Sequence, residues 1–228
     1  MTDATLKPRK TLVARIIGAL TDPGATFEDI VHRPDAVGPV LLVLITGALS
    51  VVPMVSTLRT LQETAPKGVP MLPPAFTVAT GLIGLVIGLV VWWPIRALVF
   101  MAVGSLVGSR ATFSQSLAVS GYLNVVEALS ALVSAIAVAT TGRAVTLGFG
   151  MLLSPEQAAT PWGVALNSLN VFGLIYIVLS TVALARLWKV NTSKAATATV
   201  VLWLIVVGVA AGSAYFGRQL SEMIQMPQ

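Results

Sequence analysis

The sequence predicts an all-α integral membrane protein, a helical bundle of about five transmembrane helices with a short cytosolic amphipathic region at its N-terminus. Of its 228 residues, 56% are hydrophobic and only 10% are charged, and the mean hydropathy is +0.88, which is more apolar surface than a soluble core can hide. The long apolar runs lack the alternation of barrel strands. Because each backbone N–H and C=O inside hydrocarbon must be paired internally, helices are required.

The N-terminal arm, residues 1–35, holds most of the acidic residues and many basic ones, so we expect it in water or among lipid headgroups. Apolar residues recur at helical spacing over 12–20, which predicts a short basic amphipathic helix with Arg15 on its polar side. This helix either lies on the membrane surface or packs against the cytosolic ends of the other helices. Asp22 followed by Pro23 indicates the start of a second short helix, over 23–31.

Five apolar segments are long enough to cross a membrane. Their expected bounds are 37–57, 75–107, 116–139, 163–187 and 195–216. As one helix the second segment would measure about 50 Å, against a hydrocarbon core of about 30 Å, so it must kink at Pro94, tilt or protrude. The chain thus divides into the arm, a five-span membrane domain at 36–217 and a short polar tail at 218–228.

The Lys and Arg residues predict the orientation of these spans. Ten of the 14 lie in segments on the side of the N-terminal arm, and four lie on the opposite side. The positive-inside rule places the N-terminus in the cytosol, and five spans then place the C-terminus on the opposite side. The net charge of +5 does not indicate nucleic-acid binding, because the chain has no basic stripe with interleaved aromatic residues.

The sequence contains no catalytic motif, and we expect a protein that is not an enzyme and has no cofactor. It lacks cysteine, a zinc-protease helix motif, a serine-hydrolase elbow, a phosphate-binding loop and a pair of intramembrane acids. His32, which stands beside Arg33, has no second ligand nearby in the sequence, so no metal site is expected there.

Two ionisable residues, Arg96 and Glu127, fall inside the apolar segments. A charge at the centre of a membrane helix costs roughly 2.5–3.5 kcal/mol, so we expect each of the two residues to have a structural or functional role. Antiparallel packing would bring both to a depth of about 17 Å from the connecting turn, where they would form an ion pair. In the alternative, Trp92 and Trp93 lie at headgroup level, and Arg96 reaches the inner surface. Such a pair would either fix helix register or take part in function.

Three amides complete the intramembrane polar set. Asn124 shares a helix face with Glu127, and Asn167 and Asn170 lie in the fourth segment. These side chains either hydrogen-bond between helices or, with Arg96, line a path for a solute. Three glycine pairs have the spacing that lets helix backbones approach closely: Gly84 with Gly88, Gly104 with Gly108, and Gly208 with Gly212.

Two short motifs resemble those of one membrane protein family. Asp35, Gly38 and Pro39 stand at the junction into the first span, and Gly121 and Tyr122 lie in the third span. They are similar to the Asp-Leu-Tyr-Gly-Pro segment and the Gly-Tyr of the Yip family, the Ypt/Rab-interacting proteins and their prokaryotic relatives. In this chain Ala-Val replaces Leu-Tyr, and the proline expected soon after Gly-Tyr is absent.

The resemblance implies five spans, a cytosolic N-terminus and a non-enzymatic membrane protein linked to vesicle traffic and small GTPases. We therefore expect a scaffold or adaptor that sits in the lipid bilayer and contacts a membrane-protein or cytosolic partner; self-association as a homo-oligomer is left open. The alternative is a small-solute or lipid transporter that uses the intramembrane polar residues. The sequence identifies neither partner nor substrate, nor the cellular membrane that holds the chain.

Overall fold

The computed structural model describes residues 10–63, 73–142, 148–158 and 160–225. Within these ranges every regular element is helical: α1 (Leu12–Thr21), α2 (Pro23–His32), α3 (Val37–Glu63), α4 (Pro74–Leu106), α5 (Phe113–Tyr122), α6 (Asn124–Thr141), η1 (Phe149–Leu152), α7 (Pro155–Ala158), α8 (Pro161–Ser168), α9 (Val171–Trp188) and α10 (Thr192–Gln225). Residues 1–9 of the predicted arm and 226–228 of the predicted tail lie outside the described residues.

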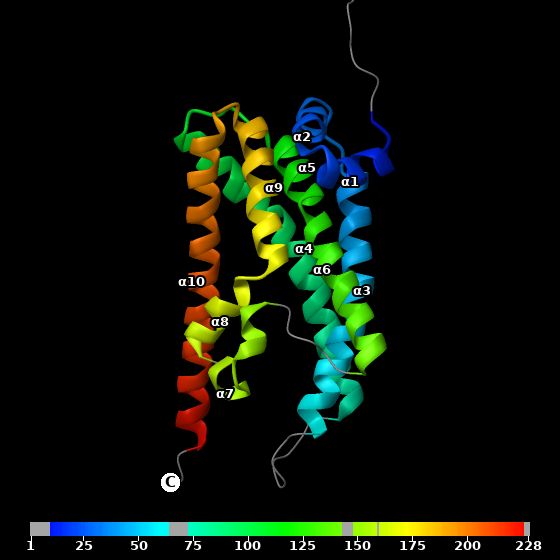
Figure 1. Ribbon diagram of the computed structural model, residues 1–228, viewed down its shortest axis with the longest axis vertical. Coiled ribbons are helices and arrows are strands. Elements are labelled where there is room, and N and C mark those ends of the chain that lie inside the picture. The colour runs from blue at the N-terminus through cyan, green and yellow to red at the C-terminus, as the bar shows by residue number, and fades with distance from the viewer. Residues whose placement is uncertain (1–9, 64–72, 143–147, 159, 226–228) are drawn as a thin grey trace, which may run out of the picture.

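The described helices include five that are long and apolar enough to cross a membrane. They are Val37–Thr60, Ala75–Leu106, Phe113–Thr141, Val171–Trp188 and Thr192–Gly217. This confirms the predicted all-α bundle with five candidate spans. Figure 1 shows the long helices running along the long axis of the molecule, with α1 and α2 at one end and α7, α8 and the C-terminus toward the other.

The two arm helices form where the sequence predicts them, and they pack onto the bundle. Asp22 caps α2, its side chain accepting the Ala25 N–H at 3.4 Å, and Pro23 occupies the first helical position. Phe27 and Ile30 of α2 are fully buried, and α2 packs against α5 and α9. The arm helices are therefore part of the same hydrophobic core as the spans.

The first amphipathic helix, α1, packs against other helices, as one of its two alternatives predicts. Arg15 and Gly18 are buried on the side that packs against α2 and α3, whereas Val13 and Ile17 are 64% and 56% exposed on the other side. The helix thus packs against the ends of other helices and also turns an apolar stripe outward. The expectation that the arm lies in water or among lipid headgroups does not hold for Arg15, because this guanidinium is completely buried.

The first and last spans extend further than the hydropathy pattern predicts, whereas the second span ends at Leu106, close to its predicted end. Pro53 and Pro94 lie inside α3 and α4, and neither proline ends its helix. The last helix, α10, continues beyond the expected end at residue 216 as far as Gln225. The predicted polar tail is therefore helical within the described residues, because polar side chains do not prevent a helix from continuing past the hydrocarbon.

The third and fourth spans contain breaks that the sequence did not predict. Leu123 separates α5 from α6. In the fourth span α8 ends before Asn170, whose side chain caps the start of α9 by accepting a backbone N–H at 2.9 Å. One continuous helix over 163–187 is therefore a wrong prediction, since the Asn170 amide competes with the regular backbone pairing of a helix.

Candidate functional site

The two family-like motifs meet where α1, the start of α3 and the end of α5 come together. The Arg15 guanidinium forms an ion pair with the Asp35 carboxylate, and the Tyr122 hydroxyl donates to the same carboxylate at 3.0 Å. The second Asp35 oxygen accepts the Gly38 N–H at 2.9 Å, in the first turn of α3. Asp35 therefore links the arm to the first and third spans.

Two glycines allow these elements to touch. A Cβ added to Gly38 would lie 2.1 Å from the Tyr122 hydroxyl oxygen, and one added to Gly121 would lie 2.3 Å from the Cβ of Pro39. Real side chains do not approach so closely, so the contact requires glycine at both positions. We call the set formed by these motif residues and the arm arginine the arm junction: Arg15, Asp35, Gly38, Pro39, Gly121 and Tyr122.

Arg15 is the member of the arm junction that the sequence did not indicate. Its Nε lies 2.8 Å from an Asp29 carboxylate oxygen, in addition to the contact with Asp35. Burial disfavours the charged guanidinium, but hydrogen bonding and attraction to Asp29 outweigh this cost and raise the pKa of Arg15 above its ordinary value. A basic residue in a short amphipathic helix is typical of a solvated face, so its sequence context did not indicate a buried ion pair.

A second polar cluster surrounds Arg96 in the middle of the bundle. Arg96 Nη1 lies 2.8 Å from Glu127 Oε1, and Nη2 donates to the Ser120 carbonyl at 2.6 Å and to the Asn124 side chain. Glu127 is the central residue of the span Phe113–Thr141. The structure thus contains the ion pair between the second and third spans, well away from the ends of both spans.

The alternative that placed Arg96 at the inner surface depended on the two tryptophans. Trp93 instead donates its indole N–H to the Leu117 carbonyl at 2.8 Å and so packs between α4 and α5. Trp92 is half-exposed. The Trp93 indole is therefore bonded inside the bundle, and Arg96 contacts Glu127, as the first alternative predicts.

Arg96 also explains how the break in the third span is tolerated. In an uninterrupted helix the Ser120 carbonyl would accept the N–H of Asn124. Here α5 ends at Tyr122, and the guanidinium donates to the Ser120 carbonyl instead. A backbone acceptor that would be costly to leave unpaired in a membrane is thus satisfied by a charged side chain.

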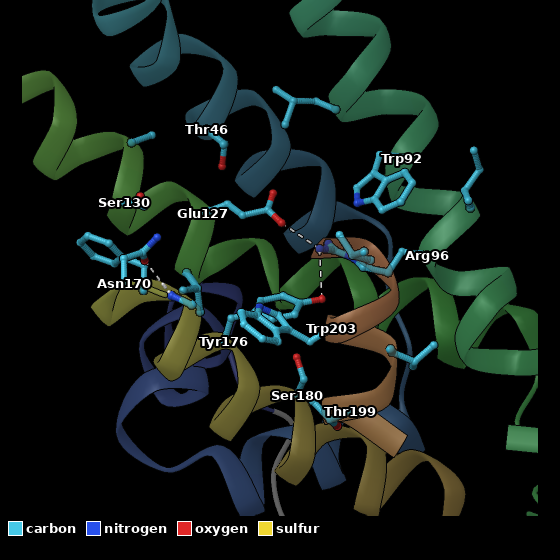
Figure 2. Close-up of a pocket in the computed structure, with 18 of the residues that line it drawn as sticks. Thr46, Trp92, Arg96, Glu127, Ser130, Asn170, Tyr176, Ser180, Thr199 and Trp203 are labelled. Atoms are coloured by element: carbon cyan, nitrogen blue, oxygen red, sulfur yellow. Dashed lines mark hydrogen bonds and ion pairs between the residues drawn. The ribbon is translucent and has the colours of Figure 1, made fainter. Parts of the chain in front are cut away.

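A cavity of about 640 Å³ lies beside this cluster, with walls from α3, α4, α6, α9 and α10. Its volume falls within the range of about 300–1,000 Å³ that is typical of ligand sites. Figure 2 shows Arg96 and Glu127 in its wall, with Tyr176 and Trp203 close by. Of the other predicted polar residues, Asn170 lines the cavity, whereas Asn167 lies on α8 against Gly150 of η1.

The cavity wall contains three hydroxyl groups that were not predicted from the sequence as site residues. Thr46, Ser180 and Thr199 are almost fully buried, and their hydroxyl oxygens have no hydrogen-bond partner among the described residues. The Nε of Arg96 is unpaired in the same way. Ser and Thr in membrane helices commonly bond to a carbonyl of their own helix, so their presence in a sequence does not signal a site.

Two further observations concern the whole described chain. Within the described ranges no three His, Cys, Asp or Glu side chains come close enough together to hold a metal ion. In a comparison with protein families, the model described as the Yip1 domain matches residues 17–214. Among curated proteins and solved structures no match is found. The matched range contains the Arg96 cluster and all residues of the arm junction except Arg15.

Proposed function

This chain belongs to the Yip1 domain family, and from that premise we propose that it acts as a non-catalytic membrane scaffold or adaptor. Its partner-binding surface is formed by α1 and α2. The observation that carries the proposal is the arm junction, in which a fully buried arginine and tyrosine hold the arm on the bundle. A surface that is already ordered binds a partner without the entropic cost of ordering a loose segment.

The chemistry of this surface favours a protein partner in the cytosol or at the inner membrane face. The distribution of Lys and Arg supports a cytosolic arm. On α2 the exposed side includes Glu28 and His32, whereas on α1 it includes the apolar Val13 and Ile17. The arm thus offers a polar face to a soluble partner and an apolar face to the membrane surface.

A site-specific crosslinking experiment tests this role. A photoactivatable residue in place of exposed Glu28 should capture a defined protein in cells, and capture should fall at least several-fold when Asp35→Asn loosens the arm junction. The same probe at Leu204, which is 55% exposed in the middle of α10, is the control and should contact lipid instead. Capture that is absent at Glu28, or that Asp35→Asn leaves unchanged, argues against the proposal.

The cavity supports a second candidate, the movement of a small solute or lipid along the intramembrane polar residues. Arg96, Glu127 and Asn170 contribute to its wall together with hydroxyls from three other helices. If the protein carries out such transport, vesicles containing it should show a flux that Glu127→Gln abolishes. Equal flux through both proteins, or none through either, would leave the scaffold role as the better account.

A further inference from the structure

The cavity has the properties of a site that is reached from the bilayer. On one side α4 packs against α3 and α5, and on the other α10 packs against α8 and α9, so the cavity lies between two groups of helices. Trp92 on α4 and Val206 on α10 line it, and both side chains are 48% exposed. Because α4 and α10 are both candidate membrane spans and pack mainly against other helices, an apolar molecule would enter between them from the lipid.

At the end of this cavity nearer the arm, α9 and α4 are in contact. The Trp188 indole N–H donates to the Phe100 carbonyl at 2.9 Å, which joins the end of α9 to α4. A Cβ on Gly104 would lie 2.5 Å from the same indole nitrogen, so the two helices touch there. Along α4 the cavity extends from Leu89 to Phe100, roughly 16 Å, or about half of a hydrocarbon core.

The polar groups of the cavity wall that have no hydrogen-bond partner indicate which polar atoms a bound molecule should carry. Figure 2 shows them following one another through the cavity, from Thr46 past Arg96 and Glu127 to Ser180 and Thr199. The three hydroxyls and Arg96 Nε are buried and unpaired among the described residues. A buried polar group without a partner is costly, so a ligand that offers hydroxyl and carbonyl oxygens at this depth gains hydrogen bonds at little expense.

The charge of the wall selects against ionised lipids. Arg96 is the cation in the cavity wall, and Glu127 already neutralises it at 2.8 Å. A phosphate brought to this depth would place two anions beside one cation, in a place where desolvation is expensive. An uncharged head group has no such penalty.

We propose that this cavity is a binding site for one uncharged glycerolipid of the diacylglycerol class. Its hydroxyl and ester carbonyls bind the free wall groups, and its acyl chains leave between α4 and α10 into the bilayer. The site requires neither the scaffold role nor transport, since a lipid can be held without being moved.

Photolabelling tests the site directly. The full-length protein is placed in phosphatidylcholine vesicles that contain a small fraction of photoactivatable diacylglycerol. We expect saturable labelling of the α4 and α10 segments around Trp92 and Val206, displaced by unlabelled diacylglycerol and not by phosphatidic acid. The proposal is wrong if photoactivatable phosphatidylcholine or phosphatidic acid labels these segments equally well. It is also wrong if labelling does not saturate, as expected for a cavity holding only water or bulk lipid chains.

Variants of the free hydroxyls test the recognition. Ser180→Ala and Thr199→Val should each weaken diacylglycerol binding about threefold to tenfold, the value of one hydrogen bond. Because neither hydroxyl has a partner among the described residues, the thermal unfolding temperature of both variants should equal or exceed that of the parent. Ser116→Ala is the matched control, because it removes a buried unpaired hydroxyl outside the cavity wall. An equal loss of binding in this control contradicts the assignment.

A cavity-filling variant provides an independent check. Ala131 is a buried residue of the cavity wall, and Ala131→Phe places an aromatic ring in the space. We expect diacylglycerol labelling around Trp92 and Val206 to disappear. Full labelling in this variant would show that the lipid lies elsewhere.

Discussion

At the scale of single residues, Asp35 links three helices, although its sequence motif indicated only the junction into the first span. It contacts Arg15 of α1 and, 87 residues away in the sequence, Tyr122 of α5, while its second oxygen binds the backbone of α3. The carboxylate compensates a fully buried guanidinium, and a buried charge without a partner is strongly destabilising. Residues that carry the family resemblance therefore have a structural role within this chain.

Asp35→Asn should destabilise the protein by about 2–4 kcal/mol, because Arg15 keeps only Asp29 as a charged partner. Thermal unfolding in detergent would measure the loss, and protease cleavage of the arm would show whether α1 and α2 detach first. Glu28→Gln is the matched control, since it converts an exposed acid of the same arm into an amide. Equal stability of the two variants would contradict the role given to Asp35.

Gly38→Ala should also destabilise the protein, by about 1–3 kcal/mol, since the new methyl group would collide with the Tyr122 hydroxyl. Gly84→Ala is the control, because a Cβ at Gly84 meets nothing within 4 Å, and its stability should stay within about 1 kcal/mol of the parent. Melting curves of both variants in the same detergent would test this difference. A stable Gly38→Ala protein would mean that the arm junction adapts easily.

At the scale of helices, the break between α5 and α6 and the position of Arg96 depend on each other. The break leaves the Ser120 carbonyl without its usual helical partner, and Arg96 on α4 supplies the missing donor at 2.6 Å. The same guanidinium binds Glu127 and Asn124. One side chain therefore fixes the register of α4 against both halves of the third span, which agrees with a structural role for the ion pair.

This arrangement predicts that exchanging the two charges does not restore stability. In the variant Arg96→Glu with Glu127→Arg, the charges are still opposite, but the carboxylate at position 96 faces the Ser120 carbonyl and cannot donate to it. The exchanged protein should remain about as unstable as Arg96→Glu alone, as measured by thermal unfolding in detergent. Recovery to the melting temperature of the parent would show that charge attraction alone accounts for the contact.

At the scale of the whole molecule, the bundle has a packed end and a looser middle. Around the arm, side chains from α1, α2, α5 and α9 form a closed core that includes Phe27 and Tyr122. Further along the spans, α10 and α4 separate around the 640 Å³ cavity. The end with the arm suits a stable protein surface, whereas the middle suits exchange of a lipid with the bilayer.

The orientation of the molecule can be tested with reporters. Five spans and the excess of Lys and Arg on the side of the arm predict a cytosolic N-terminus and a C-terminus on the other side of the membrane. Fusions of a reporter that is active only in the cytosol should give signal at the N-terminus and none at the C-terminus. Signal from both fusions would contradict a chain that crosses the membrane five times.

The sequence predicted well what depends on local pattern. Apolar runs were sufficient to predict five spans, because a chain in hydrocarbon must pair its backbone within each helix wherever the other helices lie. Asp22 with Pro23 marked the start of α2, because a cap depends on neighbouring residues only. Depth counted along antiparallel helices was likewise sufficient to bring Arg96 and Glu127 together as one possible pair.

The tertiary structure alone decided which polar groups are buried and what they contact. By itself the sequence determined a helical membrane protein with five spans and a basic N-terminal side. The burial of Arg15, the break at Leu123 and the unpaired hydroxyls around the cavity depend on side chains from helices far apart in the chain. Helical periodicity specifies which residues share a face of one helix, whereas tertiary packing decides which faces contact each other. The free energy of burying a polar side chain depends on the groups that it contacts there.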